Sequence, residues 1–146
     1  KNVIVGARPR ESCFSEDGKF VFVTSEISCE ISKIRVSDGS IVNQIALSKD
    51  MAKPKDILLG ADQKTLFVAG GRANEIYVVD SITMTVENSI QVGRRVWGLA
   101  LSSSGKLLFT TDGLDHQISV IDTAKRSVIK TVKVGQFPWG VITYKP

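Results

Sequence analysis

Arginine, lysine and tryptophan side chains recur in this sequence at intervals of 42 to 45 residues, each time at the start of a short apolar run. Cations attract carboxylates, and indole rings stack on planar groups or on cations. Both kinds of side chain at one cavity rim can hold an anionic or quinonoid ligand, or dock an acidic partner. The candidate ligand- or partner-binding residues are therefore Arg8, Arg10, Lys53, Lys55, Arg94, Arg95, Trp97 and Trp139.

The same residues also have a purely structural interpretation. The two tryptophans can wedge between neighbouring sheets, and the glycines that follow them, Gly98 and Gly140, can let strands approach closely. The cations can form a solvated rim without a ligand. The sequence leaves both interpretations open.

Side chains suited to catalysis or metal binding are few. The single histidine, His116, aligns with Asn74 and Cys29 in successive repeats. We expect it in a turn, because His and Asn tolerate a left-handed backbone. No nucleophile elbow, phosphate-binding loop, zinc-helix motif or haem-attachment motif occurs in the sequence. We therefore predict no catalytic and no metal-binding residues in this chain.

Aspartates and cysteines in the repeats are assigned structural roles. Asp80 and Asp122 each end an apolar run, where an aspartate accepts hydrogen bonds from the backbone of the following turn. The two cysteines, Cys13 and Cys29, form either one disulfide or two free thiols. Because Cys29 shares the turn position of His116, we expect its side chain to be exposed.

Charge and apolar patterning argue against nucleic acid and membrane partners. Nineteen basic and fifteen acidic side chains give a net charge of only +4, and no run of eighteen apolar residues occurs. A stacking surface for bases needs exposed aromatic rings. Five phenylalanines instead occupy strand positions that predict burial in the core, namely Phe14, Phe20, Phe22, Phe67 and Phe109.

An internal repeat predicts the elements that position these residues. Residues 54–137 match themselves at a shift of 42, so that Phe67 meets Phe109, and an earlier copy matches at a shift of 45, so that Pro9 meets Pro54. Each copy contains four short runs rich in Val, Ile, Phe and Thr, separated by polar turns. A period near 42 with four antiparallel strands is typical of a β-propeller blade.

The predicted fold is thus all-β, a β-propeller of four-stranded antiparallel blades, with strands A to D in each blade from the inside outward. Antiparallel alternation places the D-to-A connections and B-to-C turns at one end of the blades. The candidate residues lie in or just after the D-to-A connections, so we expect them around the mouth of the central channel. The expected boundaries are 1–5 for the outer strand of a preceding blade, 6–50, 51–93 and 94–135 for three blades, and 136–146 for an inner strand that closes the ring.

The motifs of the repeat resemble those of a known family. The turn "SSSGK" and the strand "ISVID" are similar to the YVTN-type propeller repeat. More narrowly, "VGARPRESCFSEDGK", "VGRRVWGLALS" and "VGQFPWGV" resemble the C-terminal half of periplasmic propeller proteins associated with pyrroloquinoline quinone (PQQ)-dependent alcohol catabolism. This resemblance implies a periplasmic or otherwise extracytoplasmic location, and a c-type cytochrome or a quinoprotein dehydrogenase as partner. It implies no cofactor in this chain, with PQQ or haem held by the complete complex as the alternative.

The strands at which the repeat begins and ends indicate that further blades are needed to close the ring. Three complete blades with a single strand on either side cannot close a ring, and they leave exposed sheet edges. We therefore expect the chain to be the C-terminal part of a longer, seven-bladed protein, whose N-terminal blades complete the ring. Assembly with a second chain is the rival interpretation.

Three functions are compatible with these features. The favoured one is a non-catalytic subunit that serves as a scaffold or docking module for a periplasmic redox system. The second is a subunit of an oxidoreductase with a quinone or haem site at the channel mouth. The third is a ligand- or surface-binding propeller unrelated to redox chemistry.

Overall fold

The computed structural model describes residues 2–47 and 52–144, and over these residues the regular structure consists of β-strands alone. Alternating Val, Ile, Phe and Thr residues favour extended backbone, and the polar turns between them reverse the chain. The strands are β1 (Pro9–Phe14), β2 (Phe20–Ser25), β3 (Glu30–Arg35), β4 (Ile41–Ala46), β5 (Pro54–Leu59), β6 (Thr65–Gly70), β7 (Glu75–Asp80), β8 (Thr85–Gln91), β9 (Val96–Leu101), β10 (Leu107–Asp112), β11 (Gln117–Asp122) and β12 (Ser127–Lys133).

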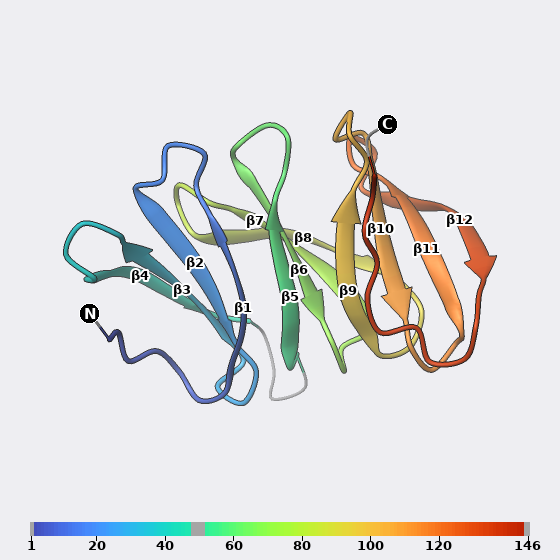
Figure 1. Cartoon of the computed structure of the whole chain (residues 1–146), viewed down its shortest axis with the longest axis horizontal. Helices are drawn as coiled ribbons and strands as arrows, with labels where there is room; N and C mark the ends of the chain where they lie inside the picture. The colour runs from blue at the N-terminus through green and yellow to red at the C-terminus, as the bar shows by residue number, and fades with distance from the viewer. Residues whose placement is uncertain (1, 48–51, 145–146) are drawn as a thin grey trace.

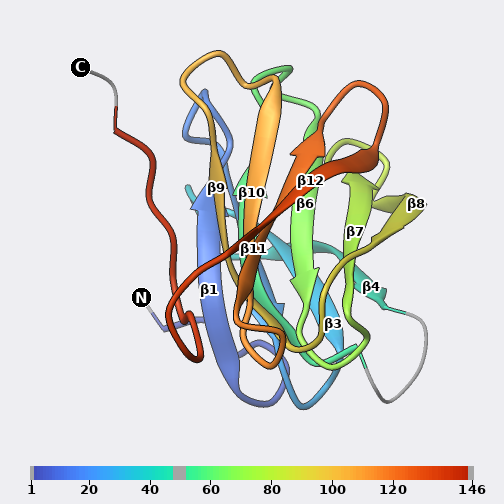
Figure 2. The ribbon, with the colours of Figure 1, turned by 90° about the vertical axis from the view of Figure 1, so that its right-hand side faces the viewer.

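The strands form three separate antiparallel sheets of four strands each. We name them blade 1 (β1–β4), blade 2 (β5–β8) and blade 3 (β9–β12). Figure 1 shows them fanned side by side, and Figure 2 shows the same fan from its right-hand side, with blade 3 toward the viewer. The first strands of the blades, β1, β5 and β9, are neighbours along the inner side of the fan. The all-β prediction with four strands per repeat is confirmed.

The hydrophobic core lies between the blades. One cluster joins blades 1 and 2 around Phe22 and Leu66, and a second joins blades 2 and 3 around Phe67 and Leu108. Successive residues of a strand point to opposite faces, so Leu66 and Phe67 serve different clusters. Blade 2 is therefore buried on both faces, which explains why its middle strands read as continuous apolar runs.

One of the five phenylalanines predicted to lie in the core is exposed. Phe14 pairs with Val21 on the face of blade 1 that points away from blade 2, whereas its neighbour Cys13 packs into the core between these blades. The prediction was wrong for Phe14, because the alternation of β1 turns this side chain to the free face. Phe22 and Phe67 are buried as predicted.

The turns repeat their backbone geometry from blade to blade. A left-handed residue stands at the same place of each connection type, for example Gly18, Gln63 and Gly105 in the three A-to-B turns, with φ of 67°, 58° and 69°. The aspartates at the ends of β7 and β11 cap the following turns. Asp80 Oδ1 accepts hydrogen bonds from the N–H groups of two turn residues at 2.8 Å each, and Asp122 Oδ1 accepts two equivalent bonds at 3.0 and 2.9 Å, which confirms their predicted role.

The segments beyond the outer strands carry no strand over residues 2–5 and 136–144. The C-terminal segment nevertheless runs beside β9, where Thr143 Oγ1 donates a 2.6 Å hydrogen bond to the carbonyl of Leu101. A Cβ built on Gly98 would lie 3.0 Å from Gly140 Cα, so Gly98 permits this close approach. The boundaries at 50/51 and 146 fall outside the described residues, and the assignment of 136–146 to a further blade stays a prediction.

Both cysteines are free thiols, and one lies differently from the prediction. Cys29 is buried rather than exposed, because its side chain turns inward from a left-handed turn position and packs in the core between blades 1 and 2. Burial, followed by the charge of Asp56, raises the pKa of Cys13 to about 12. In the described part of the chain, no helix is long and apolar enough to cross a membrane.

Candidate functional site

The connections before β1, β5 and β9 lie at the same end of the blades as the β2–β3, β6–β7 and β10–β11 turns. Backbone hydrogen bonds join them, as from the N–H of Glu26 to the carbonyl of Arg8 at 2.9 Å and from the N–H of Gly113 to that of Arg95 at 3.0 Å. We call this end of the molecule the mouth end; it lies at the bottom of Figure 1. The predicted sorting of the connections is confirmed.

Three of the predicted cations converge on one carboxylate at the mouth end. Glu26 Oε1 lies 2.6 Å from Lys55 Nζ, and Glu26 Oε2 lies 3.2 Å from Arg8 Nε and 3.5 Å from Arg10 Nε. The side chains of Lys55 and Glu26 are only 5% and 10% exposed. The pair therefore joins blade 1 to blade 2 through a largely water-excluded contact, where each charge depends on the other.

Burial and charge oppose each other at this ion pair. Burial raises the pKa of Glu26, but the hydrogen bond and charge of Lys55 and the charges of Arg8 and Arg10 outweigh it, so that the pKa of Glu26 is lowered. Burial is the largest influence on Lys55 and lowers its pKa, against the opposing effect of Glu26. Glu26 is thus held as the carboxylate that compensates the surrounding cations.

The two tryptophans stack directly on each other. Their ring centroids are 3.9 Å apart with an interplanar angle of 24°. The Lys55 ammonium lies 4.5 Å and the Arg95 guanidinium 5.1 Å from the Trp97 centroid. Trp97 is thus enclosed between two cations and a second indole, whereas Trp139 is 64% exposed. Packing accounts for Trp97, and Trp139 keeps a ring face free.

The remaining two predicted residues stand apart from this cluster. Arg94 Nε pairs with Asp115 Oδ1 at 2.7 Å in the β10–β11 turn of blade 3. Lys53 has a left-handed backbone with a φ of 46°, and its carbonyl lies over Gly71, where a Cβ would come within 2.6 Å of the oxygen. The structure therefore brings together six of the eight candidates: Arg8, Arg10, Lys55, Arg95, Trp97 and Trp139.

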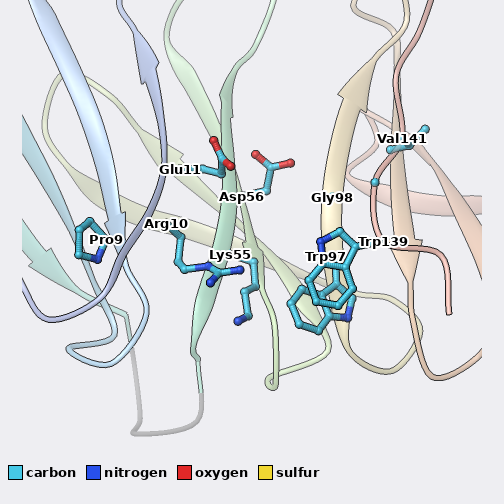
Figure 3. Close-up of a pocket in the computed structure, with 10 residues that line it drawn as sticks. Pro9, Arg10, Glu11, Lys55, Asp56, Trp97, Gly98, Trp139 and Val141 are labelled. Carbon is cyan, nitrogen blue, oxygen red and sulfur yellow. The ribbon is translucent and has the colours of Figure 1, made fainter.

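A pocket of about 340 Å³ opens beside the inner strands, and we call it the axial pocket. Figure 3 shows it between β1, β5 and β9, with Arg10, Lys55 and the tryptophan pair around it. Two carboxylates that the sequence did not single out, Glu11 and Asp56, also line it. They follow Arg10 and Lys55 in the chain, so the pocket combines both signs of charge.

Asp56 is the more constrained of these two carboxylates. Its Oδ2 accepts a 2.8 Å hydrogen bond from the N–H of Leu99, which ties β5 to β9. Burial raises the pKa of Asp56; the N–H groups of Leu99 and Ile57 lower it, and the charge of Glu11 raises it further.

Glu26 was missed by sequence reasoning, although the repeat carried a signal for it. The equivalent positions of blades 2 and 3 hold Gly71 and Gly113. A Cβ on these glycines would lie 2.9 Å from Lys55 Cγ and 2.8 Å from Trp97 Nε1, because those side chains cross over the turn. Blade 1 departs from the pattern, and its extra carboxylate fills the space.

His116 has the turn role that its alignment predicted. Its Nδ1 accepts a 3.0 Å hydrogen bond from the N–H of Phe137, just as Asn74 Oδ1 accepts a 2.8 Å bond from the N–H of Arg95 one repeat earlier. Its backbone is left-handed, with a φ of 55°. Among the described residues, no group of three or more His, Cys, Asp or Glu side chains could hold a metal ion.

Comparison with known proteins identifies the architecture. No family model and no curated protein sequence matches the chain. Among solved structures, Kuenenia stuttgartiensis hydrazine synthase aligns with a TM-score of 0.82 at 18% identity, over 93% of this chain and 38% of that one. A streptogramin B lyase gives a TM-score of 0.79 at 18% identity, over 92% and 44% of the two chains, and the WD40 repeats of RRP9 give 0.75 at 22%, over 92% and 41%. The chain forms three blades of a β-propeller.

These similarities describe the fold alone. The identities stay below 25%, and the propellers compared include enzymes as well as a WD40 repeat protein. The chain spans about two fifths of the length of the structures that it matches. Function must therefore be argued from the residues at the mouth end.

Proposed function

We propose that this chain is part of a non-catalytic β-propeller subunit outside the cytoplasm, which docks a partner protein on its mouth end. The observation that carries the proposal is that exposed cations and an exposed indole lie at the same end of the blades. The side chains of Arg8 and Arg94 are 55% and 67% exposed, and Trp139 is 64% exposed. Arginine and tryptophan are enriched among the residues that dominate protein–protein affinity.

The partner that we propose is an acidic redox protein, either a c-type cytochrome or a quinoprotein dehydrogenase. The motifs similar to periplasmic propellers of PQQ-dependent alcohol catabolism support this partner and the extracytoplasmic location. Basic residues on one end of a subunit accelerate association with an acidic surface and align it. The blades that complete the ring are proposed to come from the same protein or from a second chain, because three blades are too few to close a propeller.

The oxidoreductase alternative is less well supported by the chemistry of the axial pocket. Haem iron requires an axial ligand such as His, Met or Cys, and none of the described residues that line the pocket is of these types. A quinone with several carboxylates would meet Glu11 and Asp56, while three of the nearby cations are already paired with Glu26. We therefore propose that any PQQ or haem is held by the complete complex rather than by these residues.

The test uses the natively purified full-length protein. We expect no haem or quinone absorbance, and salt-sensitive binding to a c-type cytochrome or quinoprotein dehydrogenase in calorimetry. Charge reversal at the mouth end, Arg8→Glu with Arg94→Glu, should weaken binding at least tenfold. Lys106→Glu is the matched control, because Lys106 is exposed in an A-to-B turn at the opposite end. A haem or quinone spectrum would favour the oxidoreductase, and equal effects of the two variants would refute docking at the mouth end.

A further inference from the structure

The axial pocket has two features that docking of a large protein leaves unused. The outer face of the Trp139 ring is free, because Trp97 covers only its other face. The carboxylates of Glu11 and Asp56 lie above and to the left of the tryptophan pair in Figure 3, and they are close enough for the charge of Glu11 to raise the pKa of Asp56. A pocket of about 340 Å³ is large enough for a small organic molecule and too small for a folded partner.

The electrostatics of the pocket floor favour a positive charge. Burial and the nearby charge of Glu11 raise the pKa of Asp56 against two backbone N–H donors, so a cation placed between the two carboxylates would favour the ionised form of Asp56. The cation that precedes it in the chain, Lys55, is held by Glu26 at 2.6 Å and faces the Trp97 ring. No cation among the described residues forms an ion pair with Glu11 or Asp56, and two neighbouring carboxylates attract an incoming ammonium group.

We propose that the axial pocket binds a small aromatic amine, with its ammonium group between Glu11 and Asp56 and its ring on the free face of Trp139. Stacking of aromatic rings contributes beyond the area that they bury, and the carboxylates supply charge-assisted hydrogen bonds. An aromatic carboxylate of the same size is disfavoured, since its charge would face Glu11 and Asp56. This inference rests on the proposed function only in that both place recognition at the mouth end.

Arg10 supplies a second contact for the ligand. Its Nε faces Glu26 at 3.5 Å, and the rest of its guanidinium group lines the pocket. A ligand that also carries a carboxylate, as a free aromatic amino acid does, would find a donor there. Tyrosine should therefore bind at least as tightly as tyramine, which lacks the carboxylate.

The test is a titration of the full-length protein with tyramine, followed by tryptophan fluorescence and calorimetry. We expect saturable quenching, with a dissociation constant below about 1 mM. Butylamine, which has no ring, and 3-(4-hydroxyphenyl)propionate, which replaces the ammonium by a carboxylate, should bind at least tenfold more weakly. Glu11→Gln, at an exposed position, and Asp56→Asn should each weaken tyramine binding at least fivefold, whereas Glu16→Gln at the opposite end should leave it unchanged.

Two outcomes would overturn the inference. One is the absence of saturable tyramine binding up to about 10 mM. The other is binding of the carboxylate analogue as tight as that of tyramine. Failure here is distinguishable from failure of the proposed function, because cytochrome or dehydrogenase docking is measured on the same protein. If the partner docks but tyramine does not bind, only this inference is refuted. If tyramine binds but the partner does not dock, only the proposed function is refuted.

Discussion

The two ends of the blades both repeat their left-handed backbone positions, but they differ in how strictly their side chains repeat. At the end opposite the mouth, each A-to-B turn has a left-handed residue at the same place and a short polar side chain that caps the backbone: Asp17, Asp62 or Ser104. At the mouth end, equivalent positions hold Glu26, Gly71 and Gly113, or Arg10, Lys55 and Trp97. Side chains that are alike at equivalent positions of every blade stabilise the fold of the blade. Side chains that differ between blades at equivalent positions form one asymmetric site. We therefore expect substitutions at the two ends to have different effects.

The largest effect is expected for the buried carboxylate of the mouth end. Glu26→Gln removes the partner of the nearly fully buried Lys55 and leaves an uncompensated charge. We expect a loss of about 3 kcal/mol in the free energy of unfolding, measured with urea. Glu16→Gln, exposed in the repeated turn of the same blade, should change it by less than about 0.5 kcal/mol. Equal losses of unfolding free energy in the two variants would contradict the difference that we infer between the two ends.

The tryptophan pair allows a comparison within the mouth end itself. Trp97→Ala removes a ring enclosed by Lys55, Arg95 and Trp139, and should cost about 2 kcal/mol in the free energy of unfolding. Trp139→Ala removes an exposed ring and should cost less than about 1 kcal/mol, while it weakens binding at the axial pocket. Thermal unfolding with a tyramine titration separates the two roles. A larger stability loss for Trp139→Ala would contradict them.

The repeated turns offer two glycines with the same backbone and different surroundings. Gly18 and Gly105 have φ of 67° and 69°, so alanine is strained at both. A Cβ on Gly105 would clash with Ala61 Cβ, whereas nothing lies within 4 Å of a Cβ on Gly18. Gly18→Ala should cost about 1 kcal/mol in the free energy of unfolding, and Gly105→Ala clearly more. Equal losses would show that the contact between blades 2 and 3 relaxes freely.

The smallest effect is expected in the acid range. Hydrogen bonds led by the N–H of Thr83 lower the pKa of Asp80 to about 2, below its ordinary value of about 4. A carboxyl group with a lowered pKa stabilises the fold above the unfolded value, and this contribution is lost as the pH falls from about 4 through 2. Asp80→Asn should therefore flatten the melting temperature against pH in that window. An unchanged slope would mean that the cap does not titrate with folding.

The blades could be predicted well from the sequence, because the repeated side chains act within their own strand or turn. Apolar alternation specifies the strands. Asp80 and Asp122 each cap the turn that directly follows them in the chain. The prediction that all D-to-A connections lie at one end of the blades needs only the antiparallel order of four strands per blade.

The site was harder to predict, because its contacts cross between blades. Neither the convergence of three cations on Glu26 nor the enclosure of Trp97 by Lys55 can be read from spacing within one repeat. The burial of Cys29 and the exposure of Phe14 were mispredicted for a similar reason, since each depends on which face of blade 1 meets blade 2. Glu26 departs from the repeat at a position where blades 2 and 3 have glycine, and this departure is the sequence signal of the site.

Hydrogen exchange on the full-length protein, with and without the proposed cytochrome or dehydrogenase partner, tests the division between the two ends most directly. Docking at the mouth end predicts protection at residues 92–95, 113–116 and 137–140, with little change in the turns at 60–64 and 102–106. Protection confined to those opposite turns would contradict it.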